Sequence, residues 1–249
     1  MTKVLVNSQG KPYIVESNKV LLGNTFGTKT ITENGTYTAS SDNLDGYSSV
    51  TVNVSGGGGG KYSLLERISD DSNNEIGTVS GFFIDANDVE YAVVCLDAQY
   101  RLAQGQWSSS TGAVTNLPLY YNLTVYSATE TATNNTQLIL DWCSANNYTS
   151  SSCTHCRSKS FLIDGVTFYG QLPNAIELID IFRRRVDINA TDTSASSYSS
   201  LIIPTGTNTW SSSQFIANTG WSLSSSGYVY PDPKTSNKFT CPILELPNQ

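Results

Sequence analysis

Short runs in which apolar and polar residues alternate dominate the first 54 positions of the chain. The clearest run is Val50-Thr51-Val52-Asn53-Val54, whose period of two is typical of a β-strand with one buried face. Further short strands are predicted at residues 4–6, 13–15 and 20–22. Asn34-Gly35 lies between β-rich residues and accepts the positive φ angles of a tight turn, so a hairpin is predicted over 29–38.

After residue 60 the pattern changes to longer elements. Residues 81–84 and 90–96 are apolar runs on either side of a polar turn, and they predict a hairpin that enters the core. Residues 198–246 combine Ser, Gly and aromatic residues in short alternating runs, and strands and loops are predicted there.

Two helices are predicted in the same region. The first begins near Thr129 or Thr131, places its apolar residues at helical spacing and stops at 146–147. The second has Pro173 in its first turn and ends at the arginines of 183–185, where cations complement the helix dipole. The predicted fold class is therefore α+β, with two helices packed on small antiparallel sheets after a small all-β N-terminal part.

Five consecutive glycines at 56–60 predict a flexible linker, because glycine has no side chain to pack and loses the most backbone entropy on ordering. We expect a short β-rich segment at 1–28, a small β module at 29–55, the linker at 56–60 and one domain at 61–249. The three strands expected over 29–55 bury little apolar area. The module is therefore expected to need a partner, either another copy or a larger assembly.

The composition describes a folded chain with a polar but weakly charged surface. About a third of its 249 residues are Ser, Thr or Asn, only 14% are charged, and the net charge is −7. An acidic chain with scattered basic residues lacks the electrostatic footprint for nucleic acid or anionic lipid. No apolar run approaches the ~18 residues of a membrane span and no secretory leader is recognised, so we expect folding in a cytosol with reduced thiols.

The candidate chemistry is limited to four residues, Cys143, Cys153, His155 and Cys156. They are zinc-ligand types and include one Cys-x2-Cys knuckle, but strong zinc sites pair two knuckles, so free thiols are the alternative and the question stays open. His155 is the only histidine, and its flanking cysteines are too close in sequence for the facing geometry of a nucleophile and its base. With no phosphate loop or dinucleotide turn either, we predict no enzyme, no metal and no cofactor.

The C-terminal third carries a family resemblance. Its motifs, in order, are Gly170-Gln171-Leu172-Pro173-Asn174-Ala175-Ile176-Glu177-Leu178, Trp210-Ser211-Ser212-Ser213-Gln214-Phe215, Gly220-Trp221, Gly227-Tyr228-Val229-Tyr230 and Cys241-Pro242-Ile243-Leu244. Together they resemble the C-type-lectin-like domain of bacteria and phages over about 62–246. The chain has neither the Glu-Pro-Asn nor the Trp-Asn-Asp triplet of calcium-dependent sugar binding. The segment over 30–52 also resembles one that recurs in tail-associated proteins of phages and prophages of gut Firmicutes.

These resemblances imply a non-enzymatic phage or prophage receptor-binding protein. Its implied partners are a bacterial surface receptor, protein or glycan, and phage tail or baseplate proteins. The resemblance also implies a homotrimer, assembly into the virion at the tail tip or fibre, and synthesis in the host cytoplasm. A retroelement diversifies some heads of this family, and whether it does so here stays open. The alternatives are a bacterial surface adhesin with the same head, and a hydrolase.

The residues expected to touch the receptor follow from strand alternation. If Trp210, Trp221, Leu223 and Val229 face the core, their neighbours in the strands point outward. Those neighbours, with residues of the adjoining loops, also match the positions that vary in diversified members of the resembled family. The predicted calcium-independent binding residues are Ile216, Asn218, Thr219, Ser222, Ser224, Tyr228, Tyr230 and Asp232. An ordinary polar sheet face is the alternative explanation.

Overall fold

The computed structural model describes residues 60–85, 87, 89–119, 131–192, 204 and 206–248, together with six strands before residue 55. The chain divides into two compact units, Met1–Gly60 and Lys61–Gln249. Apart from Gly60, the linker predicted at 56–60 lies outside the described residues.

The described strands of the first unit form two small antiparallel sheets. Their strands are β1 (Val4–Val6), β2 (Pro12–Glu16), β3 (Lys19–Leu21), β4 (Lys29–Thr30), β5 (Gly35–Thr38) and β6 (Thr51–Val54). The hairpin predicted over 29–38 is wrong, because β4 pairs with β3 and β5 pairs with β6. Gly35 lies inside β5 opposite Val54, and β6 offers four residue pairs where β4 has only two residues.

The second unit, the head, is an α+β domain. Its strands are β7 (Arg67–Ser69), β8 (Glu75–Ile84), β9 (Glu90–Leu96), β10 (Leu102–Gln106), β11 (Ser160–Ile163), β12 (Val166–Tyr169), β13 (Asn208–Ile216), β14 (Thr219–Ser224), β15 (Val229–Pro233), β16 (Asn237–Thr240) and β17 (Ile243–Pro247). Its helices are α1 (Ala132–Ala145), α2 (Ser151–Arg157), α3 (Ala175–Arg183) and α4 (Arg185–Thr191), with a 3-10 turn η2 at Ala98–Tyr100.

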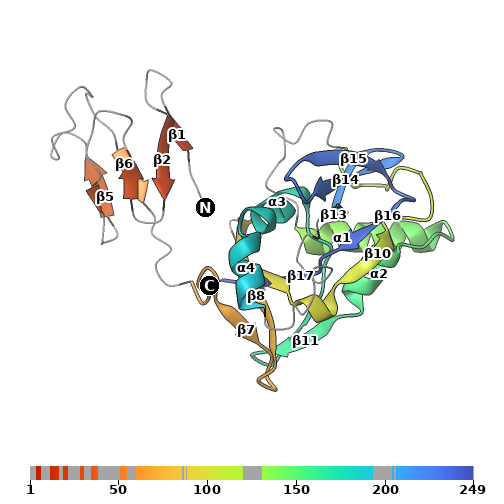
Figure 1. The fold of residues 1–249 in the computed structure, drawn as a ribbon, viewed down its shortest axis with the longest axis horizontal. Coiled ribbons are helices and arrows are strands. Elements are labelled where there is room, and N and C mark those ends of the chain that lie inside the picture. The colour runs from red at the N-terminus through yellow and green to blue at the C-terminus, as the bar shows by residue number, and fades with distance from the viewer. Residues whose placement is uncertain are drawn as a thin grey trace. The chain divides into compact units, whose positions relative to one another are not determined.

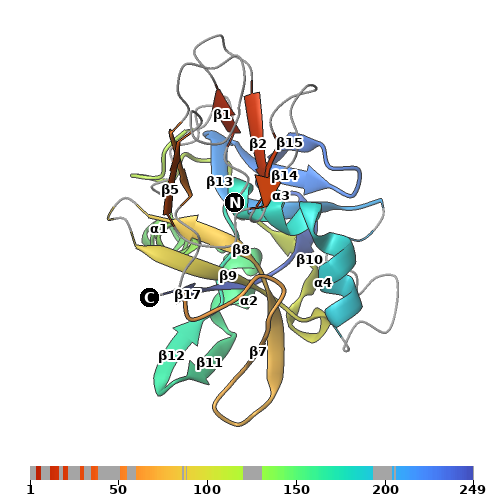
Figure 2. The same cartoon turned by 90° about the vertical axis from the view of Figure 1, so that its left-hand side faces the viewer.

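Two main sheets organise the head. One has the strand order β17-β9-β8-β7 and is antiparallel throughout, which confirms the predicted core hairpin as β8 and β9. The other has the order β10-β16-β13-β14-β15, and β13 runs parallel to β16, so the expectation of purely antiparallel sheets is wrong at this pair. Figures 1 and 2 show β14 and β15 at one end of the head and β7, β11 and β12 at the opposite end.

The predicted helices are present, and the described residues of the head contain two more. Helix α1 begins after Thr131, whose side chain accepts a hydrogen bond from the backbone N–H of Asn134, as an N-cap should. Helix α3 begins at Ala175, because Asn174 is its N-cap and forms a capping box with Glu177. Pro173 therefore lies before the helix and not in its first turn as predicted. Helices α2 and α4 have only seven residues each, too few to show a clear helical period in the sequence.

The core forms on both faces of the β8–β9 sheet and behind β13. Along β9, Val93 and Cys95 face α3 and α4, while Val94 and Leu96 face the cluster around β11 and β17, as strand alternation requires. A third cluster joins Trp107 and Trp210 to α1 and α2. Of the helices in the described ranges, none has the length and apolar character to cross a membrane.

Candidate functional site

Strands β14 and β15 bring most of the predicted binding residues to one face of the sheet. Ser222 pairs with Tyr230 and Gly220 pairs with Asp232, and directly opposed residues of antiparallel strands share a face. Tyr228 lies two residues before Tyr230 and belongs to the same row. We call the residues Ser222, Ser224, Tyr228, Tyr230 and Asp232 the β14–β15 face.

The two tyrosines are the exposed aromatic residues of this face. Tyr228 is 65% exposed and Tyr230 is 45% exposed, and their ring centroids lie 6.4 Å apart in a tilted arrangement. The turn that leads into β15 is held by hydrogen bonds from the backbone of Ser224 to the carbonyl of Tyr228, at 2.8 Å, and from Gly227 back to Ser224, at 3.0 Å. Tyr228 therefore closes a defined turn, and Tyr230 lies in the edge strand β15.

The prediction that all the polar neighbours point into solvent is wrong for Ser222. It lies on the predicted side of β14 but is buried, because side chains of the adjacent strands cover it. Its hydroxyl donates to the carboxylate of Asp232, and the amide of Asn208 lies 3.3 Å from the same hydroxyl. The predicted alternation of side chains along β14 is confirmed for Ser222. The sequence did not show that Asn208 and Asp232 would cover its hydroxyl.

Asp232 is the charged centre of this network. Its carboxylate accepts a hydrogen bond of 2.9 Å from the Asn208 amide and lies 3.1 Å from the ammonium of Lys238. Burial alone would raise the pKa of Asp232, but the hydrogen bonds from Ser222 and Asn208 and the ion pair with Lys238 lower it on balance. The charge of Asp232 is thus balanced by Lys238, and its network of hydrogen bonds lies on the same face as the two exposed tyrosine rings.

The prediction is wrong for Thr219, which lies two residues before Trp221 in β14, so its side chain is on the opposite side of the strand from Ser222 and its hydroxyl is buried. The remaining predicted residues lie in or beside the turns at the two ends of the face. Ile216 pairs with Thr219 where β13 turns into β14, and Asn218 is exposed in that turn. Ser224 is half-buried, and its hydroxyl accepts a hydrogen bond from the backbone of Tyr228. The five residues of β15 separate the β13–β14 turn from Tyr228, so the eight predicted residues span about 16 Å.

The predicted burial of the apolar anchors is confirmed, but they do not share one side of the sheet. Trp221 and Leu223 are buried with half-buried Val229 in the clusters that include residues of α3 and its N-terminus. Trp210 is also buried, but it pairs with Ser222 and therefore lies on the other side of the sheet, in the cluster with Trp107, α1 and α2. The indole N–H of Trp210 donates to the carbonyl of Gly105 at 2.9 Å. These anchors hold β13, β14 and β15 in place beneath the exposed tyrosines.

The four candidate zinc ligands do not form a cluster. Cys143, Cys153 and Cys156 are free and lie buried in an apolar cluster, where burial raises the pKa of the Cys153 thiol to about 12. The His155 imidazole instead lies 2.7 Å from the carbonyl of Tyr100. Within the described ranges, no three His, Cys, Asp or Glu side chains are arranged to hold a metal ion.

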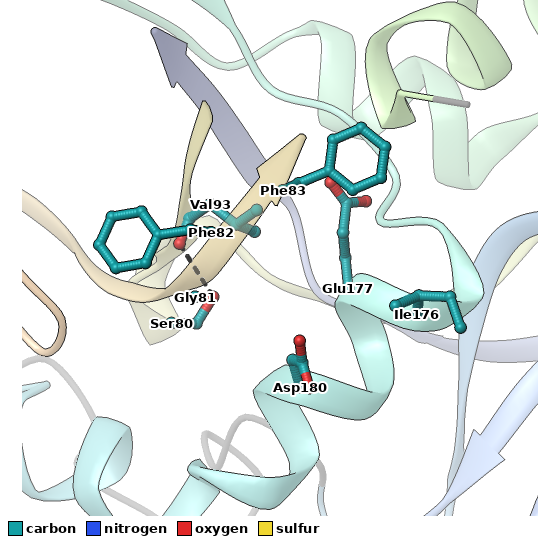
Figure 3. Close-up of a pocket in the computed structure, with 8 residues that line it drawn as sticks. All are labelled: Ser80, Gly81, Phe82, Phe83, Val93, Ile176, Glu177 and Asp180. Atoms are coloured by element: carbon teal, nitrogen blue, oxygen red, sulfur yellow. Dashed lines mark hydrogen bonds between the residues drawn. The ribbon is translucent and has the colours of Figure 1, made fainter. Parts of the chain in front are cut away.

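A small cavity lies between β8 and α3, away from the β14–β15 face. Figure 3 shows its lining, with Glu177 and Asp180 from α3 opposite Ser80 and Phe83 from β8. Its volume of about 20 Å³ holds little more than one water molecule. Burial, and then the nearby carboxylate of Glu245, raise the pKa of Glu177 well above its usual range. The cavity is therefore too small to bind a ligand larger than water.

The sequence interpretation missed three residues that support the site. Asn208 and Lys238 complete the network around Asp232, and Lys234 is fully buried directly after β15. Asn208 is two residues before Trp210 in an alternating run, and this period could have placed it on a sheet face. A lysine between polar residues carries no signal of burial, because the indoles that enclose it come from distant segments.

Comparison with known proteins identifies no relative of this chain among the family models and curated proteins. Any functional assignment therefore rests on the residues and their geometry.

Proposed function

We propose that the chain is a non-enzymatic receptor-binding protein of a phage or prophage, with a C-type-lectin-like head that binds a bacterial surface ligand through the β14–β15 face. The single observation that carries the proposal is the exposed tyrosine pair on a supported edge strand. Tyrosine offers a large contact area at little entropic cost, and Ser and Asn nearby adapt their hydrogen bonds to a ligand. Exposed aromatic rings above a satisfied polar network favour binding over turnover.

The rest of the proposal depends on the motif order and on the first unit. The head contains the resembled motifs in their expected sequence order, and residues 1–60 form a separate unit with two small sheets. Such small sheets are marginal alone, which favours attachment to a tail or to sister chains in a homotrimer. Calcium plays no part in the proposed binding.

The test compares the full-length protein with the double substitution Tyr228→Ala and Tyr230→Ala on an array of bacterial cell-wall glycans and surface proteins. Each substitution is expected to weaken binding by roughly 2 kcal/mol or more, which is about 30-fold. The melting temperature should change by no more than a degree or two, because both rings are exposed.

The matched control is Tyr169→Ala. Tyr169 is 50% exposed, comparable with the two tyrosines of the face, but it belongs to β12 at the opposite end of the head. Its removal should leave binding unchanged. Unchanged binding in the Tyr228 and Tyr230 variant, or equal loss in the control, would refute the proposed face.

A further inference from the structure

Lys234 occupies an unusual site for a lysine. It is fully buried, and its ammonium lies 4.4 Å from the ring centroid of Trp107 and 5.9 Å from that of Trp142. Such distances are those of cation–π contacts. Within the described residues no carboxylate lies at ion-pair distance from this ammonium, so the indoles and neutral acceptors are its main partners.

Those acceptors connect two parts of the head. The Lys234 ammonium donates to the carbonyl of Gly112 at 2.8 Å and to the side-chain oxygen of Gln214. Gln214, in β13, also accepts from the backbone N–H of Val114 at 3.0 Å and donates to the carbonyl of Leu117 at 3.2 Å. One buried pair of side chains thus holds three points of residues 107–119, which we call the 107–119 segment.

The same lysine contacts the predicted binding region through its backbone. Its N–H donates to the carbonyl of Asn218 at 3.1 Å, and its carbonyl accepts from the N–H of Ser108 at 3.1 Å. Asn218 is one of the predicted binding residues, in the turn between β13 and β14. The 107–119 segment is therefore tied to the end of the β14–β15 face that the tyrosines do not occupy.

We infer that Lys234 is a positioning residue, a clamp that holds the 107–119 segment against the sheet beside the β13–β14 turn. Its relevance to receptor binding rests on the function proposed above, with the segment forming one border of the binding surface. The clamp itself follows from the hydrogen bonds and indole contacts and needs no ligand.

The clamp has a pH dependence of defined sign. Burial lowers the pKa of Lys234 from 10.5 to about 7. Among the described residues, the titratable group that acts on it is the Cys143 thiol of α1, whereas the indoles, the Gly112 carbonyl and Gln214 do not titrate. Opening the clamp would return the amine to water and to its ordinary pKa. The open form then binds the extra proton between pH 7 and about 10, so the closed form gains on the open form as the pH rises above 7.

Hydrogen exchange of the full-length protein, followed by mass spectrometry without any ligand, tests this inference. Protection factors of the 107–119 amides should lie at least tenfold below those of β9, which indicates local opening. They should rise by up to tenfold per pH unit above pH 7 and level off below it. Lys234→Met should abolish this rise, and Lys238→Met, which alters a neighbouring lysine outside the clamp, should keep it.

Three results would overturn the inference. One is a pH-independent protection of the segment in the wild-type protein. This measurement does not depend on the folding of any variant. Another is the same pH profile in Lys234→Met. The third is protection of the segment equal to that of β9, because the segment would then open only when the whole head unfolds. Loss of receptor binding alone would bear on the proposed function and would leave the clamp standing.

Discussion

Gly227, in the turn before Tyr228, should be the least replaceable of the glycines with positive φ in the described head. Its φ is +86°, and a Cβ placed on it would lie 2.6 Å from Cε1 and 2.8 Å from Cζ of Phe182 in α3. Alanine at this position therefore meets two separate penalties, one in the backbone and one against a ring.

The magnitudes follow from the two penalties. An L-residue held in the left-handed region costs roughly 1–2 kcal/mol, and an extra group forced against a packed ring costs about 1–3 kcal/mol. Gly227→Ala should therefore lower the free energy of unfolding by about 2–5 kcal/mol. The chain supplies matched controls, because Gly165 and Gly206 also have positive φ, of +75° and +78°, but open space around the added Cβ. Their alanine variants should lose only the backbone share, about 1–2 kcal/mol.

Urea denaturation of the three variants measures the difference, with an unchanged m-value showing that stability alone has changed. A double-mutant cycle with Phe182→Ala then isolates the ring contact, since Gly227→Ala should cost only the backbone share once the ring is gone. Because Tyr228 is the next residue, Gly227→Ala should also weaken receptor binding. If Gly227→Ala costs no more than Gly206→Ala, the contact with Phe182 is not rigid and the proposed support of the turn is wrong.

Two further predictions concern buried charges. Asp192→Asn should destabilise the head by about 3–5 kcal/mol in urea denaturation, because it removes the counter-charge 2.6 Å from the buried guanidinium of Arg101; the exposed-pair control Arg183→Gln should cost about 1 kcal/mol or less, and equal losses would contradict this. The pKa of Glu177 is raised in the folded head, so the folded head keeps this proton at a pH at which the unfolded chain has released it. The protonated carboxyl therefore favours the folded state, and that contribution to the free energy of unfolding is lost as the pH rises through the pKa of the folded head. Glu177→Gln should therefore gain stability relative to the wild type between pH 5 and pH 8, and a pH-independent difference would refute the assignment.

Local patterns in the sequence were enough to predict several elements and the direction of several side chains. The caps and apolar spacing of α1, and the apolar runs of β8 and β9, depend on neighbours within a few residues, so they are legible without the fold. The alternation along β14 and β15 likewise assigned Leu223 to the core and Tyr228 and Tyr230 to the surface, because a strand sends successive side chains to opposite faces.

Only the tertiary structure decided which polar residues are covered and by what. Ser222 is on the predicted face, but Asn208 and Asp232 from the two adjacent strands bury it. Lys234 is enclosed by Trp107 and Trp142, which lie about a hundred residues earlier in the chain. Periodicity reports which way a side chain points, because that is set by the backbone of its own strand, whereas burial depends on segments that meet only when the chain has folded.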